Sequence, residues 1–289
     1  MGAKDFPGAP LLCNQARPES MRTSHPTANE LGMGAHDEQR ASVRIFDNLY
    51  YIGKGNVNAW AVHTAEGIII VDALNNASDW TDVIEPSLRA LDLDPGLIRY
   101  VVVTHGHGDH YGGAAYLART YHARILMSDV DWGLVNEPRD RPYFDPPPTR
   151  DLTIRDGESL SLGGETLKFF ITPGHTLGTV SVLIPVTWQG TPHLVALWGG
   201  TGFNFARTPE RFGQYSDSAL RFLGLARTHN ADVPLANHPD IDALPTKLSK
   251  LAARKPGDPH PFILGSEGVD RFLRTLSECA LAVEAQIRD

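Results

Sequence analysis

The pattern of hydrophobic and polar positions changes at about residue 42. Residues 1–41 mix proline, asparagine, serine, glycine and alanine with little periodicity, which indicates an extended N-terminal arm. Beyond the arm, short β-rich runs separated by glycine-containing turns predict a meander of strands, and these runs cover 43–53, 58–65 and 67–73. We therefore expect one folded domain over residues 42–289, preceded by the arm.

Helical spacing alternates with strand patterns in the rest of the first half. Residues 78–93 carry apolar side chains at about helical spacing behind a Ser or Asp cap, and 111–122 return to the same spacing, so both predict helices. Between them, the unbroken β-branched run at 98–104 is typical of a buried strand. Strands therefore come first and helices later.

A proline-rich stretch at 137–150 has no periodic face, and we place the boundary between two halves there. The second half repeats the order of the first: a hairpin and two strands are followed by helices, at 158–174, 179–186, 193–200, 209–228, 245–254 and 265–289. Two strand-then-helix halves predict an α+β fold in which two sheets pack face to face with helices outside.

Composition narrows the range of partners. The 289 residues include 26 Lys and Arg against 34 Asp and Glu, a formal charge of -8, and no basic cluster of the kind that nucleic-acid binding requires. No apolar run approaches the roughly 18 to 20 residues of a membrane span. We expect a small-molecule substrate, no nucleic acid and no membrane, while the oligomeric state stays open.

The two cysteines, Cys13 and Cys279, lie near opposite ends of the chain and lack CxxC spacing, which excludes a cysteine zinc knuckle. Pairing and free thiols both remain open. The first forty residues contain no compact apolar region of a signal peptide. Two compartments follow: the periplasm or the outside of the cell if a signal peptide has been removed, and the cytoplasm otherwise.

The candidate chemistry lies in VVVTHGHGDHYGG, directly after the predicted buried strand. His105 and His107 stand two residues apart, so in an extended segment their imidazoles project to the same side, and Asp109 and His110 open the next helix. All four side chains are zinc-compatible ligands. Because the neighbours Asp109 and His110 point in different directions, the motif favours two metal centres a few ångströms apart.

THGHGDHYGG resembles the His-x-His-x-Asp-His motif of the metallo-β-lactamase superfamily. Two further segments are similar to that family: GIIIVDA, which ends its buried strand at Asp72, and TPGHTLGTVSVLI, which carries the third histidine. The resemblance covers about Val43 to the C-terminus and implies a four-layer αβ/βα sandwich with metals at one edge between the sheets. It leaves the arm outside.

The resemblance implies two Zn²⁺ ions per chain. The first would be held by His105, His107 and His175, and the second by Asp109, His110 and His238. Many members add a bridging carboxylate from a Gly-Asp dipeptide, whereas LWGGTGFN offers Thr201 at that place. This departure resembles the β-lactamase subclass whose ligands are histidines and one aspartate. Asp72 could cap a turn, but the family precedent favours a hydrogen bond to a ligand.

Two Zn²⁺ ions with Asp109 and a bridging hydroxide leave about two positive charges, which favours an anionic substrate. The expected reaction is attack of the metal-bound hydroxide on a cyclic amide, a β-lactam, with Asp109 and Thr201 as catalytic residues. The alternatives are a lactone, ester or thioester hydrolase on the same site, and a metal-binding protein with little turnover. Asn204 and Asn237 are candidates for orienting substrate, although such residues often form turns.

Overall fold

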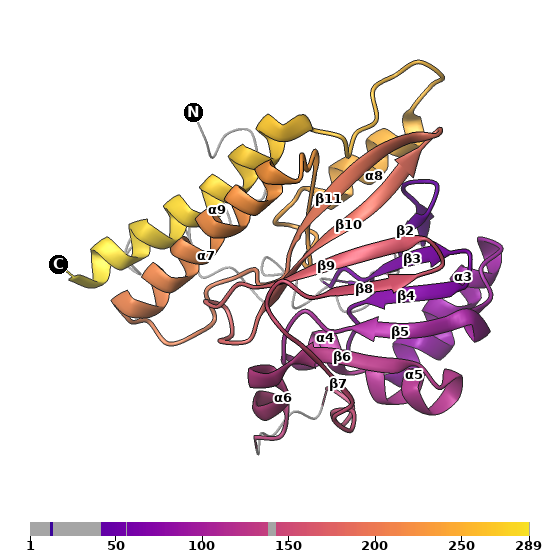
Figure 1. The fold of residues 1–289 in the computed structure, drawn as a ribbon, viewed down its shortest axis with the longest axis horizontal. Coiled ribbons are helices and arrows are strands. Elements are labelled where there is room, and N and C mark those ends of the chain that lie inside the picture. Colours follow the sequence, from indigo (N-terminus) through magenta and orange to yellow (C-terminus); the bar gives the residue numbers. More distant parts are fainter. Residues whose placement is uncertain (1–11, 14–41, 56, 138–142, 289) are drawn as a thin grey trace.

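The structure, a computed structural model, describes residues 12–13, 42–55, 57–137 and 143–288. The predicted arm, apart from Leu12 and Cys13, and residues 138–142 of the proline-rich loop lie outside the described residues. The strands form two sheets that pack face to face, with helices on the two outer faces (Figure 1). The predicted four-layer α+β sandwich is confirmed.

The first sheet has its strands in chain order. Its first strands pair antiparallel, while those from β4 onward pair parallel. Because parallel strands end at the same edge of a sheet, the loops that follow β4 and β5 lie close together. The strands are β1 (Val43–Arg44), β2 (Leu49–Tyr51), β3 (Trp60–Thr64), β4 (Gly67–Val71), β5 (Ile98–Val102), β6 (Arg124–Ser128) and β7 (Leu152–Ile154).

The second sheet runs in the order β12-β11-β10-β9-β8. The hairpin predicted through Gly163 and Gly164 joins β8 to β9. Because β12 pairs parallel with β11, the loops that follow these two strands lie at the same edge of the sheet. The strands are β8 (Ser159–Leu162), β9 (Glu165–Ile171), β10 (Val180–Trp188), β11 (Thr191–Trp198) and β12 (Val233–Ala236).

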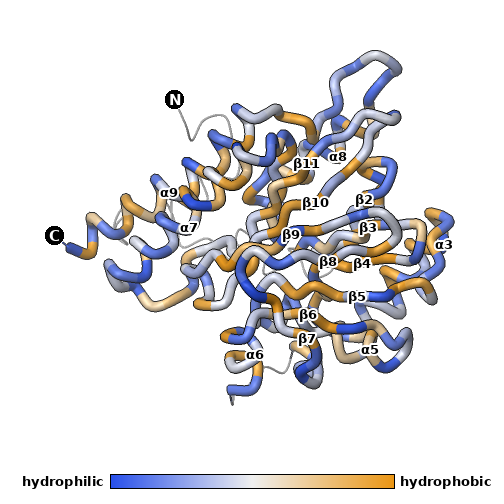
Figure 2. Tube along the Cα trace, in the orientation of Figure 1, coloured by the Kyte–Doolittle hydropathy of each residue, from blue (hydrophilic) through white to orange (hydrophobic). Residues whose placement is uncertain are grey.

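Alternation along the strands builds three hydrophobic clusters between the four layers. In β4, Ile69 and Val71 face the second sheet, whereas Ile68 and Ile70 face the helices of the first half. Both faces of the strand are thus buried, which explains the unbroken apolar run. In Figure 2 apolar residues follow the central strands, whereas apolar and polar residues alternate along the helices.

Helices cover both outer faces. Those of the first half are α2 (Ala77–Asp79), the π-helical turn η3 (Trp80–Ile84), α3 (Glu85–Ala90), the 3-10 turn η4 (Pro95–Leu97), α4 (Gly108–Tyr111), α5 (Ala114–Tyr121) and α6 (Asp129–Val135). Those of the second half are α7 (Pro209–Thr228), α8 (Leu244–Ala253) and α9 (Gly265–Arg288). The long helices α7 and α9 lie side by side over the second sheet (Figure 1).

The structure shifts one predicted position and adds elements that the sequence patterns did not predict. The sheets divide between Ile154 and Ser159, a few residues after the predicted boundary at 137–150, because β7 still pairs with β6. The additional elements are β6, α6, β7 and β12. The loop before β7 thus returns the chain to the first sheet.

Two further observations bear on open questions. A disulfide joins Cys13 to Cys279 of α9, and Leu12 beside it is buried in the cluster between α7, α9 and the second sheet. Leu12 and Cys13 of the arm are therefore attached to the folded domain. Among the described residues, no helix combines the length and apolar character of a membrane span.

Candidate metal centre

The loop after β5 carries the first two histidines. Thr104 donates its backbone N–H to Oδ1 of Asp72 at 2.8 Å and its hydroxyl to Oδ2 at 2.9 Å, so the loop after β4 fixes the loop after β5. His107 occupies the N-cap position of α4, and its backbone is extended. The chain therefore enters α4 immediately after His107, which places Asp109 and His110 in the first turn.

His105, His107 and His175 form the first triplet, and their ring nitrogens converge. Nε2 of His175 lies 3.0 Å from Nε2 of His105 and 3.1 Å from Nδ1 of His107. In a tetrahedral zinc site with Zn–N bonds of about 2.0–2.1 Å, neighbouring nitrogens lie ~3.3 Å apart. The observed spacing is close to that value, so the first triplet fits a divalent ion.

Backbone carbonyls fix the tautomers of two members of this triplet. Nδ1 of His105 donates to the carbonyl oxygen of Gly199 at 2.9 Å, and Nδ1 of His175 donates to that of Gly202 at 3.1 Å. A carbonyl oxygen can only accept, so each Nδ1 carries the hydrogen and each Nε2 keeps a lone pair directed at the centre. This is the arrangement that a metal-ligating histidine requires.

Asp109, His110 and His238 form the second triplet. Nε2 of His110 lies 3.3 Å from Nε2 of His238 and 3.3 Å from Oδ2 of Asp109, and Nε2 of His238 lies 3.7 Å from that same oxygen. On its other side His110 donates from Nδ1 to Oδ2 of Asp72 at 2.8 Å. Asp72 thus makes the contact with a candidate ligand that the sequence favoured.

The two triplets differ in charge. Burial, together with the neighbouring histidines, lowers the pKa of His105 and of His175 well below 6.5, so both imidazoles are neutral. Burial also acts to lower the pKa of His110, but the carboxylates of Asp109 and Asp72 outweigh it and raise that pKa to about 10. Without a metal, the second triplet therefore holds a proton where a cation would bind.

The triplets lie side by side and open on one side. The rings of His105 and His110, one from each triplet, have centroids 4.1 Å apart. Both rings are fully buried, whereas the side chains of Asp109 and His238 are each 23% exposed. The centre is therefore partly exposed to solvent at Asp109 and His238, and also at His107, which is only partly buried. The ends of β9, β10 and β11 converge above α4 near the middle of Figure 1.

The three remaining predicted site residues occupy different environments. Thr201 is buried and donates its hydroxyl to Oδ1 of Asn237 at 2.7 Å. Asn237 is fully buried and donates from Nδ2 to the carbonyl oxygen of Gly199 at 2.6 Å. The expectation that Asn237 orients substrate does not fit this position, because its amide is enclosed behind His105. Asn204 is exposed in the loop after β11.

Asp72 apart, sequence patterns missed the groups that hydrogen-bond to the candidate ligands and their loops. The carbonyl groups of Gly199 and Gly202 carry no side-chain signal, so spacing could not identify them. Asp131 on α6 is fully buried and accepts hydrogen bonds from two ligand loops. Its one sequence signal is Ser128-x-x-Asp131, the spacing of a helix N-terminus.

Comparisons with known proteins agree with this arrangement. The sequence model of the metallo-β-lactamase superfamily matches residues 52–187. Hydroxyacylglutathione hydrolase of Acidiphilium cryptum (strain JF-5) is 30% identical over 125 residues, which cover 43% of this chain and 43% of that protein. The same-named enzyme of Rhodopseudomonas palustris (strain BisA53) is 26% identical over 240 residues, 77% of this chain and 87% of that protein. The match to the Acidiphilium cryptum enzyme, at 30% identity, thus spans only about two fifths of that protein's length.

Solved structures share the fold over most of the chain. BJP-1, a subclass B3 metallo-β-lactamase of Bradyrhizobium japonicum, superposes with a TM-score of 0.72 at 23% identity, covering 89% of this chain and all of that one, 100%. FEZ-1 of Legionella gormanii gives 0.73 at 20% identity, covering 86% and 98%. The family's sequence model thus matches the strands and loops that carry five of the six candidate ligands, and the chain has the metallo-β-lactamase fold.

Proposed function

We propose that this protein is a two-zinc hydrolase that cleaves an acyl thioester. One observation carries the reaction type: two triplets of ligand atoms lie side by side, with the rings of His105 and His110 only 4.1 Å apart. Zinc ions bound at two adjacent sites supply a Lewis acid for the carbonyl oxygen and lower the pKa of the attacking water. The nucleophile then does not have to come from a side chain.

The protein residues hold and orient these groups. Asp109 is the one carboxylate among the six, and the neighbouring His110 and His238 hold its pKa well below the usual range against the opposing effect of burial. It therefore stays ionised at all working pH values. Because the other five ligands are imidazoles, two divalent ions would leave the site strongly positive, which favours a substrate with a carboxylate or a polarised carbonyl.

The curated relatives support the choice of a thioester. Six are named hydroxyacylglutathione hydrolase, and another, from Claviceps purpurea, is named atrochrysone carboxyl ACP thioesterase and is 29% identical over 119 residues. Thioesters and β-lactams both present an activated acyl carbon, so the same ligand set serves either reaction. The identity to the Acidiphilium cryptum and Claviceps purpurea proteins is 29 to 30% over 119 to 125 residues, and that to the Rhodopseudomonas palustris (strain BisA53) enzyme is 26% over the longer match of 240 residues.

A β-lactam is the second candidate, and Thr201 is the observation that favours it. Its hydroxyl is hydrogen-bonded to Asn237 in the place where many relatives carry a bridging carboxylate. The site is then one negative charge short, which would favour the carboxylate of a β-lactam. If this candidate is correct, Thr201→Asp should lower kcat/KM for an anionic β-lactam more than for a neutral lactone, with zinc content unchanged.

A substrate panel tests the proposal. The full chain is stripped with a chelator, reloaded with zinc and assayed on acyl-glutathione thioesters, an acyl-CoA, a neutral lactone, a penicillin, a cephalosporin and a carbapenem. We expect kcat/KM to be highest for a thioester and to disappear when zinc is removed. A preference for any β-lactam by tenfold or more would replace the first candidate with the second.

Two variants control the panel. His107→Ala removes a ligand from the first triplet, and it should lower the rate on the preferred substrate by at least about a hundredfold. His229→Ala removes a histidine that contacts Lys168 and the carbonyl oxygen of Leu225, outside both triplets, so its rate should stay unchanged. An active His107→Ala protein would show that the hydrolysis takes place elsewhere.

A further inference from the structure

We propose that Asp131 is a positioning residue, which fixes the relative positions of the two loops that carry the first triplet, one from each sheet. The inference rests on the proposed metal-dependent function, because it concerns how well His105, His107 and His175 bind an ion. Asp131 lies in α6, between β6 and β7, and its side chain is completely buried.

The carboxylate accepts a hydrogen bond from each loop. Its Oδ2 accepts the backbone N–H of Gly106, the residue between His105 and His107, at 2.7 Å. The same oxygen accepts the hydroxyl of Thr176, the residue after His175, at 2.7 Å. Its Oδ1 accepts the backbone N–H of Gly178 at 3.1 Å. Among the described residues, each hydrogen bond to the carboxylate comes from a residue no more than three positions from a candidate ligand.

These loops belong to different layers. The loop with Gly106 follows β5 of the first sheet, whereas the loop with Thr176 joins β9 to β10 of the second sheet. A single side chain that bonds both therefore fixes the distance between His105 and His175 across the sheet interface. A carboxylate suits this position because it is an acceptor at every lone pair and the three groups facing it are donors.

The two ligand loops pack closely against Asp131 and the start of α6. A Cβ atom built on Gly178 would lie 2.2 Å from Oγ of Ser128 and 2.5 Å from Oδ1 of Asp131. A Cβ atom on Gly106 would lie 3.2 Å from the backbone oxygen of Asp131. Both ligand loops therefore press directly on the first turn of α6. The glycines permit the close approach that the hydrogen bonds need.

The second triplet has a separate support. His110 is held by Asp72, and none of the described hydrogen bonds of Asp131 goes to Asp109, His110 or His238. Loss of the Asp131 carboxylate should therefore weaken one ion and spare the other. A residue that merely stabilised the fold would weaken both ions together or neither.

The test is a stepwise metal titration of Asp131→Asn. Zinc affinities are measured by competition with a chromophoric chelator, and cobalt(II) absorption reports the environment of each bound ion. We expect the affinity for one ion to fall about 10- to 100-fold, as for other groups that orient metal ligands, with the affinity for the second ion changed less than about threefold. The cobalt spectrum of the weakened ion should also change.

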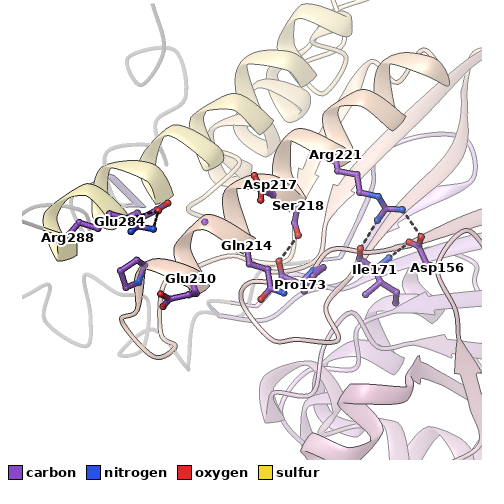
Figure 3. Close-up of a pocket in the computed structure, with 12 residues that line it drawn as sticks. Asp156, Ile171, Pro173, Glu210, Gln214, Asp217, Ser218, Arg221, Glu284 and Arg288 are labelled. Atoms are coloured by element: carbon purple, nitrogen blue, oxygen red, sulfur yellow. Dashed lines mark hydrogen bonds and ion pairs between the residues drawn. The ribbon is translucent and has the colours of Figure 1, made fainter.

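Asp156→Asn is the matched control. Asp156, like Asp131, accepts a hydrogen bond from a backbone N–H. Its donor is Ile171 at 2.9 Å, at the end of the strand that leads to His175, but its other partner is the exposed Arg221. Figure 3 shows these contacts in a groove between α7 and that strand, outside both triplets. The control should keep both metal affinities.

If Asp131→Asn does not fold, Thr176→Val and Thr176→Ser test the role of Asp131 instead. Valine removes the donor to Asp131 at nearly constant shape, whereas serine keeps it. We expect the valine variant to weaken the same ion and the serine variant to restore it. Equal affinities in wild type, Asp131→Asn and Thr176→Val would overturn the role of Asp131, whereas a wild-type chain that binds no metal would overturn the proposed function as well.

Discussion

The hydroxyl of Thr201 donates a hydrogen bond to Oδ1 of Asn237 at 2.7 Å, and both side chains are buried beneath the metal centre. Asn237 in turn donates from Nδ2 to the carbonyl oxygen of Gly199, which also accepts from His105. The pair therefore joins the loops after β11 and β12 to the first triplet. A neutral hydrogen bond thus occupies the place where the resemblance described above would lead one to expect a bridging carboxylate.

Replacing Thr201 by valine should lower the free energy of unfolding of the metal-free protein by about 1–3 kcal/mol, because Oδ1 of Asn237 would lose its donor in a buried position. Thr201→Ser keeps the hydroxyl and should cost less than half as much. Urea denaturation of the three proteins at one pH measures both differences. Equal stabilities of the valine and serine variants would show that the hydrogen bond contributes nothing.

Two kinds of sequence signal point to the candidate ligands. His105, His107, Asp109 and His110 share one strand-to-helix junction, where their spacing suggests metal binding, whereas His175 and His238 follow only from the resemblance to the family. Their supports come from distant segments. Thr201 and Asn237 are 36 residues apart, and only the tertiary fold shows that their side chains bond to each other.

Missed elements have local physical reasons. The strand β12 contains Pro234, which cannot donate to a ladder and so weakens a strand pattern, but β12 is an edge strand of the second sheet, where proline is tolerated. The short β6 and α6 follow each other without a turn residue between them, so their two patterns overlap. Missing α6 meant missing Asp131.

His105→Ala should reduce metal binding and activity more than His238→Ala. His105 is fully buried, is bonded to Gly199 and contacts members of both triplets, whereas the side chain of His238 is 23% exposed at the open edge. We expect the His105 variant to lose at least about tenfold more zinc affinity than the His238 variant. Elemental analysis at fixed free zinc gives the comparison, and unchanged metal content in the His238 variant would remove that residue from the site.

Reduction of the disulfide between Cys13 and Cys279 should lower the free energy of unfolding by about 2–4 kcal/mol, because the bond restricts the unfolded chain over a separation of 266 residues. Thermal unfolding with and without reductant measures the shift, and the Cys13→Ser/Cys279→Ser double variant should be insensitive to reductant. A wild-type protein that is equally insensitive would show that the bond contributes no net stability.

The same disulfide leads us to propose an oxidising compartment, the periplasm or the exterior, over the cytoplasm. Protein isolated from its own cells under rapid alkylation should then show no modified cysteine by mass spectrometry. Alkylation of both cysteines would place the protein in a reducing compartment instead.

The affinity for the second zinc ion should rise with pH, while that for the first stays nearly constant. Asp109 and Asp72 raise the pKa of His110 to about 10, so between pH 6 and 8 a zinc ion must displace its proton to bind at the second triplet. The affinity for the second ion then increases about tenfold for each pH unit, up to the pH at which His110 loses its proton. A cation already bound at the first triplet lowers the pKa of His110, so the increase should end below pH 10. His105 and His175, whose pKa values lie well below 6.5, have no proton to release in that range.

Competition titrations at pH 6, 7 and 8 measure the two slopes, and calorimetry in two buffers counts the released proton. Asp72→Asn removes one of the carboxylates that raise the pKa of His110, so its slope for the second ion should be shallower than that of the wild type. Arg124 and Asp151 form an ion pair on the surface, so Asp151→Asn serves as a control that should keep the wild-type slope. If both ions showed the same pH dependence in the wild type, His110 would not be the group that competes with the second ion for its site.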